Sequence, residues 1–175
     1  KRFFSITLIS LALFGCGGDA PDTSGTNNSG AVLDGYLSSA RVFLDCNNNG
    51  ELDAGEISTL TDDKGQYYFN VASSIVNSCV KVAKATAGIT VDLDDPNSPL
   101  TESYTMIAPA SESSVVSPMT TLVYAKMKEG KSQTEAIEEL KTEMSFDESV
   151  DLFEDYVKKK ETDSKYTEIH NIATT

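Results

Sequence analysis

The sequence predicts an α+β chain in which a small antiparallel β-sandwich precedes a helical segment. Between residues 31 and 112, short runs rich in β-branched and aromatic residues alternate with turn residues, a pattern typical of consecutive strands in a sandwich. Beyond residue 113 the apolar residues recur every three or four positions, as they do on the buried face of a helix. We therefore expect a sandwich over 31–112 and a helical segment over 113–175, and we expect the protein to continue beyond the printed chain.

The N-terminus has the features of an export signal. A basic start is followed by a nearly continuous apolar run over 3–14, which is too short to span a bilayer. The motif Leu-Phe-Gly-Cys over 13–16 resembles the lipobox of bacterial lipoproteins, in which the cysteine is lipidated and becomes the new N-terminus. This predicts a signal peptide over 1–15, a lipid anchor at Cys16 and a polar, flexible tether over 16–30.

The residue after Cys16 bears on the destination of the chain. It is Gly17 rather than Asp, which resembles the default that sorts Gram-negative lipoproteins to the outer membrane. We expect an outer-membrane or cell-surface lipoprotein, with the periplasmic face as a further possibility. The alternative is an ordinary signal peptide cut near Ala20.

Strands are expected wherever a short β-favouring run is bounded by turn residues. The predicted strands cover 31–35, 40–45, 57–61, 66–71, 79–85, 90–93 and 104–108. The turn Asp62-Asp63-Lys64-Gly65 makes 61–71 a predicted hairpin. Within 79–85 we expect Val80 and Val82 to face inward while Lys81 and Lys84 face solvent.

A twelve-residue loop over 45–56 fills every position of the pattern D-x-[DN]-x-[DN]-G-x5-E, which wraps oxygen ligands around Ca²⁺. The ligand positions hold Asp45, Asn47, Asn49, the backbone carbonyl of Glu51, Asp53 and Glu56. Gly50 supplies the sharp turn, and Leu52 is expected to pack inward. Because its flanks read as strands, the loop is not part of a helix–loop–helix EF-hand. The alternative is an Asx-rich turn that binds nothing.

The helical segment shows clear start signals. Ser117-Pro118 combines an N-cap with proline at the first helical position, and Ser132 with Glu135 forms a capping box. A third helix is expected from Asp147, with Phe146, Val150, Phe153 and Val157 on its apolar face, and a fourth over 167–173.

Charge and cysteine content limit the function classes. The net charge of −13 argues against a nucleic-acid partner, because phosphates would be repelled. Once Cys16 is lipidated, Cys46 and Cys79 remain, and in an oxidising compartment they predict a disulfide, with two free thiols as the alternative.

We expect no enzymatic activity from this chain. His170 is its single histidine, and no nucleophile, general base or phosphate loop assembles around it. Asp62 and Asp63 are interpreted as turn residues, and Asp92–Asp95 as a solvated turn, although each cluster leaves extra metal ligands open.

Three segments carry a family resemblance: VFLDCNNNG over 42–50, DAGE over 53–56, and TDxxGxYxF over 61–69. Together they resemble the B-type domains of serine-aspartate repeat adhesins and the carboxypeptidase-regulatory-like domains. The resemblance covers about 31–85 and implies an Ig-like or prealbumin-like sandwich that Ca²⁺ stiffens. Those adhesins are anchored in the cell wall, whereas a lipobox implies a lipid anchor.

The expected function is therefore a calcium-stabilised structural or adhesive module of a bacterial surface lipoprotein. Its partner would be a surface protein or a glycan. The alternatives are a carbohydrate-binding module and a non-catalytic part of a larger secreted enzyme. Carbohydrate binding needs exposed aromatic rings, and the candidates are Tyr36, Tyr67, Tyr68 and Tyr104.

Overall fold

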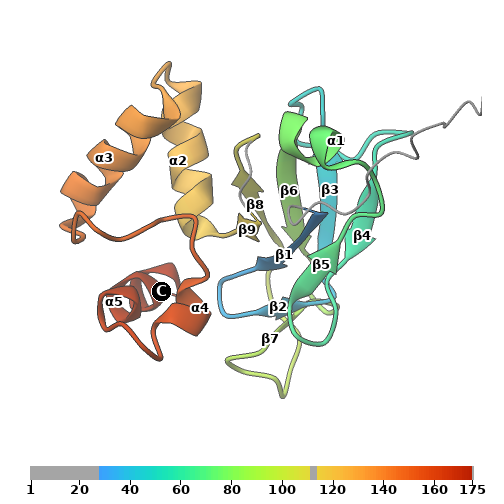
Figure 1. The fold of residues 1–175 in the computed structure, drawn as a ribbon. Coiled ribbons are helices and arrows are strands. Elements are labelled where there is room, and N and C mark those ends of the chain that lie inside the picture. Colours follow the sequence, from blue (N-terminus) through green and yellow to red (C-terminus); the bar gives the residue numbers. More distant parts are fainter. Residues whose placement is uncertain (1–27, 111–113, 175) are drawn as a thin grey trace, which may run out of the picture.

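The computed structural model describes residues 28–110 and 114–174, and within them strands give way to helices as the chain proceeds (Figure 1). This confirms the predicted α+β class. The predicted signal peptide, Cys16 and the tether up to residue 27 lie outside the described residues. The strands are β1 (Ser29–Val32), β2 (Leu37–Ser38), β3 (Arg41–Asp45), β4 (Ser58–Leu60), β5 (Gln66–Tyr68), β6 (Val80–Ala85), β7 (Val91–Asp92), β8 (Tyr104–Ala108) and β9 (Val115–Val116). The helices are α1 (Ser73–Ser78), α2 (Pro118–Lys128), α3 (Gln133–Met144), α4 (Tyr156–Lys159) and α5 (Lys165–Ala173).

The largest sheet has the strand order β4-β3-β6-β8, and all its pairs are antiparallel. Its central strands, β3 and β6, have apolar residues on both faces because both faces are covered. Successive side chains of a strand point to opposite faces, so Val42 and Leu44 enter one core cluster while Phe43 enters another.

A second sheet has the order β5-β1-β9, and β2 pairs with β7 separately. β1 is antiparallel to β5 but parallel to β9, so one pairing departs from the all-antiparallel arrangement we predicted. β9 also lies inside the segment predicted to be helical. Val115 and Val116 come just before the predicted N-cap Ser117, and as β-branched residues they pair with Ala31 and Val32 of β1.

The predicted hairpin over 61–71 is only partly correct. Its turn forms, with Gly65 at φ +72° and the Asp62 N–H donating to the carbonyl of Gln66 at 2.8 Å. The strands on either side nevertheless join different sheets, because β4 pairs with β3 and β5 pairs with β1. The turn therefore carries the chain from one sheet to the other.

The predicted orientation of β6 is wrong at Lys81. Lys81 and Lys84 are three residues apart, so they point to opposite faces of the strand. Lys84 lies at the surface, where it forms an ion pair with Glu51, whereas Lys81 is 0% exposed and shares its face of β6 with the core residue Ala83.

The predicted tether over 16–30 is wrong at residues 28–30, which belong to the fold. Asn28 is fully buried, its carbonyl accepts the N–H of Phe69 at 2.7 Å, and its side chain bonds Val71 and Ser73. Residue 29 already belongs to β1. Helix α1, which was not predicted, begins at Ser73. It buries Val76 in the apolar cluster that also holds Val42 and Leu44 of β3.

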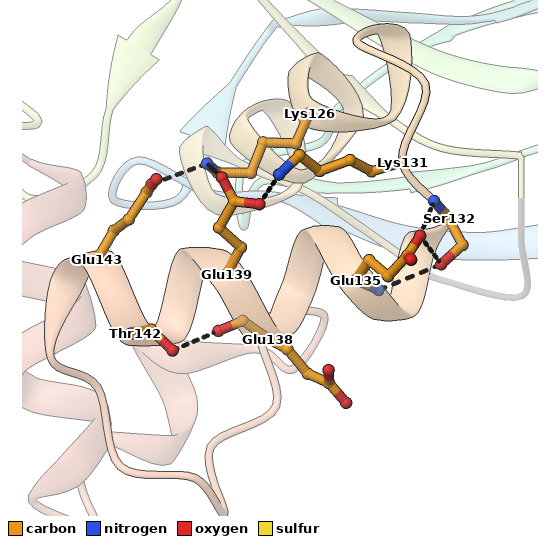
Figure 2. A network of polar contacts seen from close by, with 8 residues as sticks. All are labelled: Lys126, Lys131, Ser132, Glu135, Glu138, Glu139, Thr142 and Glu143. Carbon is orange, nitrogen blue, oxygen red and sulfur yellow. Dashed lines mark hydrogen bonds and ion pairs between the residues drawn. The ribbon is translucent and has the colours of Figure 1, made fainter.

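The predicted starts of α2 and α3 are confirmed. Figure 2 shows the capping box at the start of α3 and the ion pairs between the two helices. The Ser132 hydroxyl accepts the N–H of Glu135, whose carboxylate accepts the N–H of Ser132 in return, as the capping box predicts. Between the helices, Lys126 contacts Glu139 at 2.9 Å and Glu143 at 2.8 Å. Lys131 adds a second ion pair to Glu139. These contacts hold α3 along the side of α2.

The third predicted helix does not form over 147–155. Asp147 and Asp151 each accept a backbone N–H two residues ahead, from Ser149 and Phe153, both at 2.9 Å. These Asx turns compete with helical hydrogen bonding, so only the short α4 is helical here. The apolar residues of this segment were predicted to be buried, and Val150 is indeed only 2% exposed. The fourth predicted helix is confirmed as α5.

The helices share a core with the second sheet rather than standing apart from it. Ala31 and Leu33, from β1 and the residue after it, cluster with Met119 and Val123 of α2 and with Ile169 of α5. One of the apolar clusters therefore links β1 and the residue after it to the helices.

Candidate metal centre

The loop over 45–56 joins the end of β3 to the start of β4 and is held by its own polar side chains. Asp45, the first predicted ligand, is only 1% exposed. Its carboxylate accepts the backbone N–H groups of Asn49 at 3.2 Å and Gly50 at 2.7 Å. Gly50 has φ +79°, the left-handed conformation that the pattern requires at this position. Asp45 therefore fixes the turn as well as standing at the first ligand position.

The two asparagines bring the middle of the loop together. The amide oxygens of Asn47 and Asn49 accept the N–H groups of Asn49 at 3.0 Å and Glu51 at 2.8 Å, which makes two consecutive Asx turns. Their amide nitrogens both donate to Asp53 Oδ2, at 2.8 and 2.7 Å. The side chains at the third, fifth and ninth loop positions therefore meet at one carboxylate oxygen.

Glu56 closes the loop. Its Oε1 accepts the N–H of Cys46 at 3.1 Å, and its Oε2 accepts the N–H of Asp53 at 3.1 Å. The last predicted ligand is thus tied to the second and ninth loop positions. At Glu51, whose backbone carbonyl is the seventh predicted ligand, the side chain pairs with Lys84 at 2.5 Å, which attaches the loop to β6.

The donor set suits a hard cation, because every ligand position offers oxygen. Asp53 Oδ2 accepts hydrogen bonds from the amide nitrogens of both Asn47 and Asn49. A cation at this point would need the two amides to present oxygen instead, and that rotation would give up the Asx turns their oxygens now make. The residue types are ones that Ca²⁺ accepts, and binding of Ca²⁺ by this loop stays a prediction.

The loop departs from a conventional carboxylate cluster. Among the described residues, no group of three or more His, Cys, Asp or Glu side chains gathers closely enough to hold a metal ion. Asp45, Asp53 and Glu56 each bond a different part of the loop, and asparagine amides lie between them. The five predicted side-chain ligands thus share one network, and their role in binding Ca²⁺ stays a prediction.

One loop prediction is wrong. Leu52 was expected to pack inward, but it is 37% exposed. An inward apolar residue at this position is typical when a loop lies between two packed helices, whereas this loop projects from a sheet. Asn48, with φ +60°, adopts a second left-handed turn within the loop, a conformation that asparagine tolerates better than most residues.

The predicted disulfide is confirmed. Cys46 and Cys79 are bonded, with Cα atoms 4.4 Å apart and a separation of 33 positions in the sequence. The bond joins the second residue of the loop to the residue that precedes β6. The loop is therefore tied to β6 at two points, through Cys79 and through Lys84.

The other acidic clusters have local partners. Asp62 Oδ1 accepts the N–H groups of Lys64 and Gln66, both at 2.9 Å, and these bonds hold the pKa of Asp62 below its ordinary value. This is the turn role we predicted. Asp92 likewise accepts the N–H of Asp94 at 2.9 Å within its own turn. Asp94 reaches across to His170 on α5, also at 2.9 Å, a contact the sequence did not indicate.

The tyrosine candidates for carbohydrate binding separate clearly by exposure. Tyr67 is 3% exposed, and the hydroxyls of Tyr36 and Tyr104 bond Asp155 and Asp34. Tyr68 is 51% exposed and borders a largely polar cleft of about 550 Å³ between β4 and β5. The carbohydrate hypothesis therefore rests on Tyr68.

Searches of protein-family models, curated proteins and solved structures found no match to the chain. Within residues 28–110 and 114–174, no helix is both long and apolar enough to cross a membrane.

Proposed function

We propose that this chain is a calcium-stabilised structural or adhesive module of a bacterial surface lipoprotein. The observation that carries the proposal is the loop over 45–56, whose predicted ligand side chains share one hydrogen-bonded network. Two sheets that share an apolar cluster support the finer proposal of an Ig-like or prealbumin-like sandwich. The partner would be a surface protein or a glycan.

Bound Ca²⁺ would neutralise the loop carboxylates and link the end of β3 to the start of β4. The chain's own residues would hold it: Asp45 from the buried end of β3, Asn47 and Asn49 through their amide oxygens, Glu51 through its carbonyl, and Asp53 and Glu56 through their carboxylates. Three carboxylates among six ligands is a low charge count. We expect a Kd of about 10⁻⁴ to 10⁻³ M, which suits a permanently filled extracellular site.

Calcium is expected to raise the melting temperature of the chain. At about 2 mM free Ca²⁺ and the Kd above, linkage gives about 1–2 kcal/mol of added stability, or about 3–6 °C in Tm. Differential scanning calorimetry and titration calorimetry measure both quantities. Mg²⁺ is expected to give little shift, because it prefers a smaller, regular octahedral shell.

Glu56→Gln is expected to abolish the calcium shift, since it removes one of the three charged ligands. Glu102→Gln makes the same change at an exposed position outside the loop and serves as the matched control. An unchanged Tm in Ca²⁺, with no heat of binding, would rule out the calcium site.

Anchoring through Cys16 is proposed from the lipobox resemblance alone. In a Gram-negative host, the chain is expected in the membrane fraction, and Cys16→Ser is expected to move it to the soluble fraction. Fractionation followed by immunoblotting measures the distribution. Equal membrane association of both forms would contradict the lipid anchor.

A further inference from the structure

One face of the sheet β5-β1-β9 is only partly covered by the helices. The register pairs Ser29 with Tyr68 and Ala31 with Gln66, so these four side chains lie on the same face. Ala31 is 8% exposed because it packs in the apolar cluster with α2 and α5, whereas Ser29, Gln66 and Tyr68 are exposed. The helices therefore cover this face at Ala31 and leave two polar side chains and a tyrosine ring uncovered beside it.

The uncovered residues line the cleft of about 550 Å³, a volume typical of small-molecule sites. Thr59 and Leu60 of β4 also line the cleft, and Leu60 is 50% exposed. Asp62, from the turn between β4 and β5, and Asp155, from the residue before α4, belong to the same lining. Two sheets, a turn and the start of a helix therefore meet at one cleft.

Several hydrogen-bonding groups in this cleft are free to meet a ligand. The hydroxyls of Ser29 and Tyr68 and the side-chain amide of Gln66 make no hydrogen bond to any described residue. The carboxylate of Asp155, in contrast, is fixed, because its Oδ2 accepts the hydroxyl of Tyr36 at 2.8 Å and its Oδ1 caps α4. Each of these carboxylate oxygens keeps a further lone pair. The cleft thus combines free donors and acceptors with a positioned carboxylate.

The charge of the cleft limits the class of ligand. Its described lining residues include two carboxylates, Asp62 and Asp155, and no Lys, Arg or His. An anionic ligand would be repelled, whereas neutral hydroxyl groups can donate to the carboxylates in charge-assisted hydrogen bonds. An added peptide strand fits less well, because β4 and β5, which border the cleft, are three residues long and offer few backbone groups.

We propose that the cleft binds a neutral sugar, whose apolar ring face stacks on Tyr68. Its hydroxyls would bond Gln66 and the carboxylates of Asp62 and Asp155. The exposed tyrosine ring supplies the apolar contact, and the surrounding polar groups supply the orientation. The inference rests on the proposed function in taking a glycan as the partner, although none of the described lining residues belongs to the loop over 45–56.

The test uses the whole chain, with cellobiose, maltose and lactose as neutral probes and binding followed by saturation-transfer NMR and chemical-shift titration. At least one of the three is expected to bind. The same disaccharide with its terminal CH₂OH oxidised to a carboxylate is expected to bind at least about fivefold more weakly, because it would meet two like charges. Absence of binding by all three at millimolar concentration would overturn the proposal, as would binding of a basic extended pentapeptide in their place.

Tyr68→Ala is the decisive variant, because it removes the stacking surface at an exposed position. Affinity for the bound disaccharide is expected to fall at least about tenfold, whereas Tyr68→Phe keeps the ring and is expected to retain most of the affinity. Ile89→Ala removes a side chain that is 62% exposed and lies outside the cleft, and it is expected to leave binding unchanged. Equal affinity of wild type and Tyr68→Ala would overturn the proposal.

Glu56→Gln separates this proposal from the calcium site. The variant is expected to lose the calcium shift in Tm and to keep the disaccharide affinity, because Glu56 does not line the cleft. Tyr68→Ala is expected to do the reverse. Failure of sugar binding beside a normal calcium shift contradicts the cleft alone, and failure of the calcium shift beside normal sugar binding contradicts the loop alone.

Discussion

Removal of the Cys46–Cys79 disulfide is expected to lower the free energy of unfolding by roughly 3–4 kcal/mol. The bond spans 33 positions, and cutting it restores the conformational freedom of that segment in the unfolded chain. The double variant Cys46→Ser/Cys79→Ser, unfolded with urea, measures the loss. Because Cys46 is the second residue of the loop, we also expect the variant to bind Ca²⁺ more weakly.

Reduction of the wild type with a phosphine reductant provides the control. It should reproduce the stability of the double variant, while the same treatment of the double variant should change nothing. If complete reduction left the urea midpoint of the wild type unchanged, the expectation would be refuted. The result would mean that the bond does not restrict the denatured chain enough to affect stability.

Lys81 is expected to contribute stability that rises between pH 8 and pH 10, relative to a variant without this charge. This side chain is 0% exposed, and burial lowers its pKa from 10.5 to about 8. In that window the unfolded chain holds a proton that the folded chain has released, so a higher pH favours the folded state. The shift corresponds to about 3 kcal/mol over the whole window, of which about 2 kcal/mol falls between pH 8 and 10.

Lys81→Met is expected to remove this pH dependence, since methionine has a similar length and no charge. Lys84→Met is the matched control, because Lys84 lies on the opposite face of β6 and is partly exposed. Urea unfolding at pH 8, 9 and 10 compares the variants. Tyrosines with raised pKa values, such as Tyr67, already destabilise the fold as the pH approaches 10, and the comparison between variants cancels this contribution because every variant keeps them. A wild-type slope equal to that of Lys81→Met would contradict the assignment to Lys81.

Local signals predicted the elements well wherever short-range chemistry decides the conformation. The capping box at Ser132 and the N-cap at Ser117 mark the starts of α3 and α2 to the residue, because a cap is made by side chains within a few positions. The turn at Asp62 and the left-handed Gly50 are of the same kind. The twelve-residue ligand pattern likewise identified side chains that form one network.

Local signals failed where hydrogen bonds outside the apolar pattern decided the conformation. Residues 147–155 carry a helical apolar pattern, yet Asp147 and Asp151 cap turns instead. Val115 and Val116 lie in a segment with helical neighbours, but a parallel pairing to β1 makes them strand. In both segments hydrogen bonds determine the conformation, and the spacing of apolar residues carries no information about them.

By itself the sequence determined the α+β class, most element positions, the ligand pattern over 45–56 and the cysteine pair. Only the tertiary structure decided which sheet each strand joins, that Lys81 is buried, and that Asp34, Asp92 and Asp94 gather near Tyr156 and His170. The physical reason is range. Turns, caps and ligand spacing depend on neighbours in the chain, whereas burial and charge crowding depend on residues as distant in sequence as Asp94 and His170, which meet only once the helices pack against the strands.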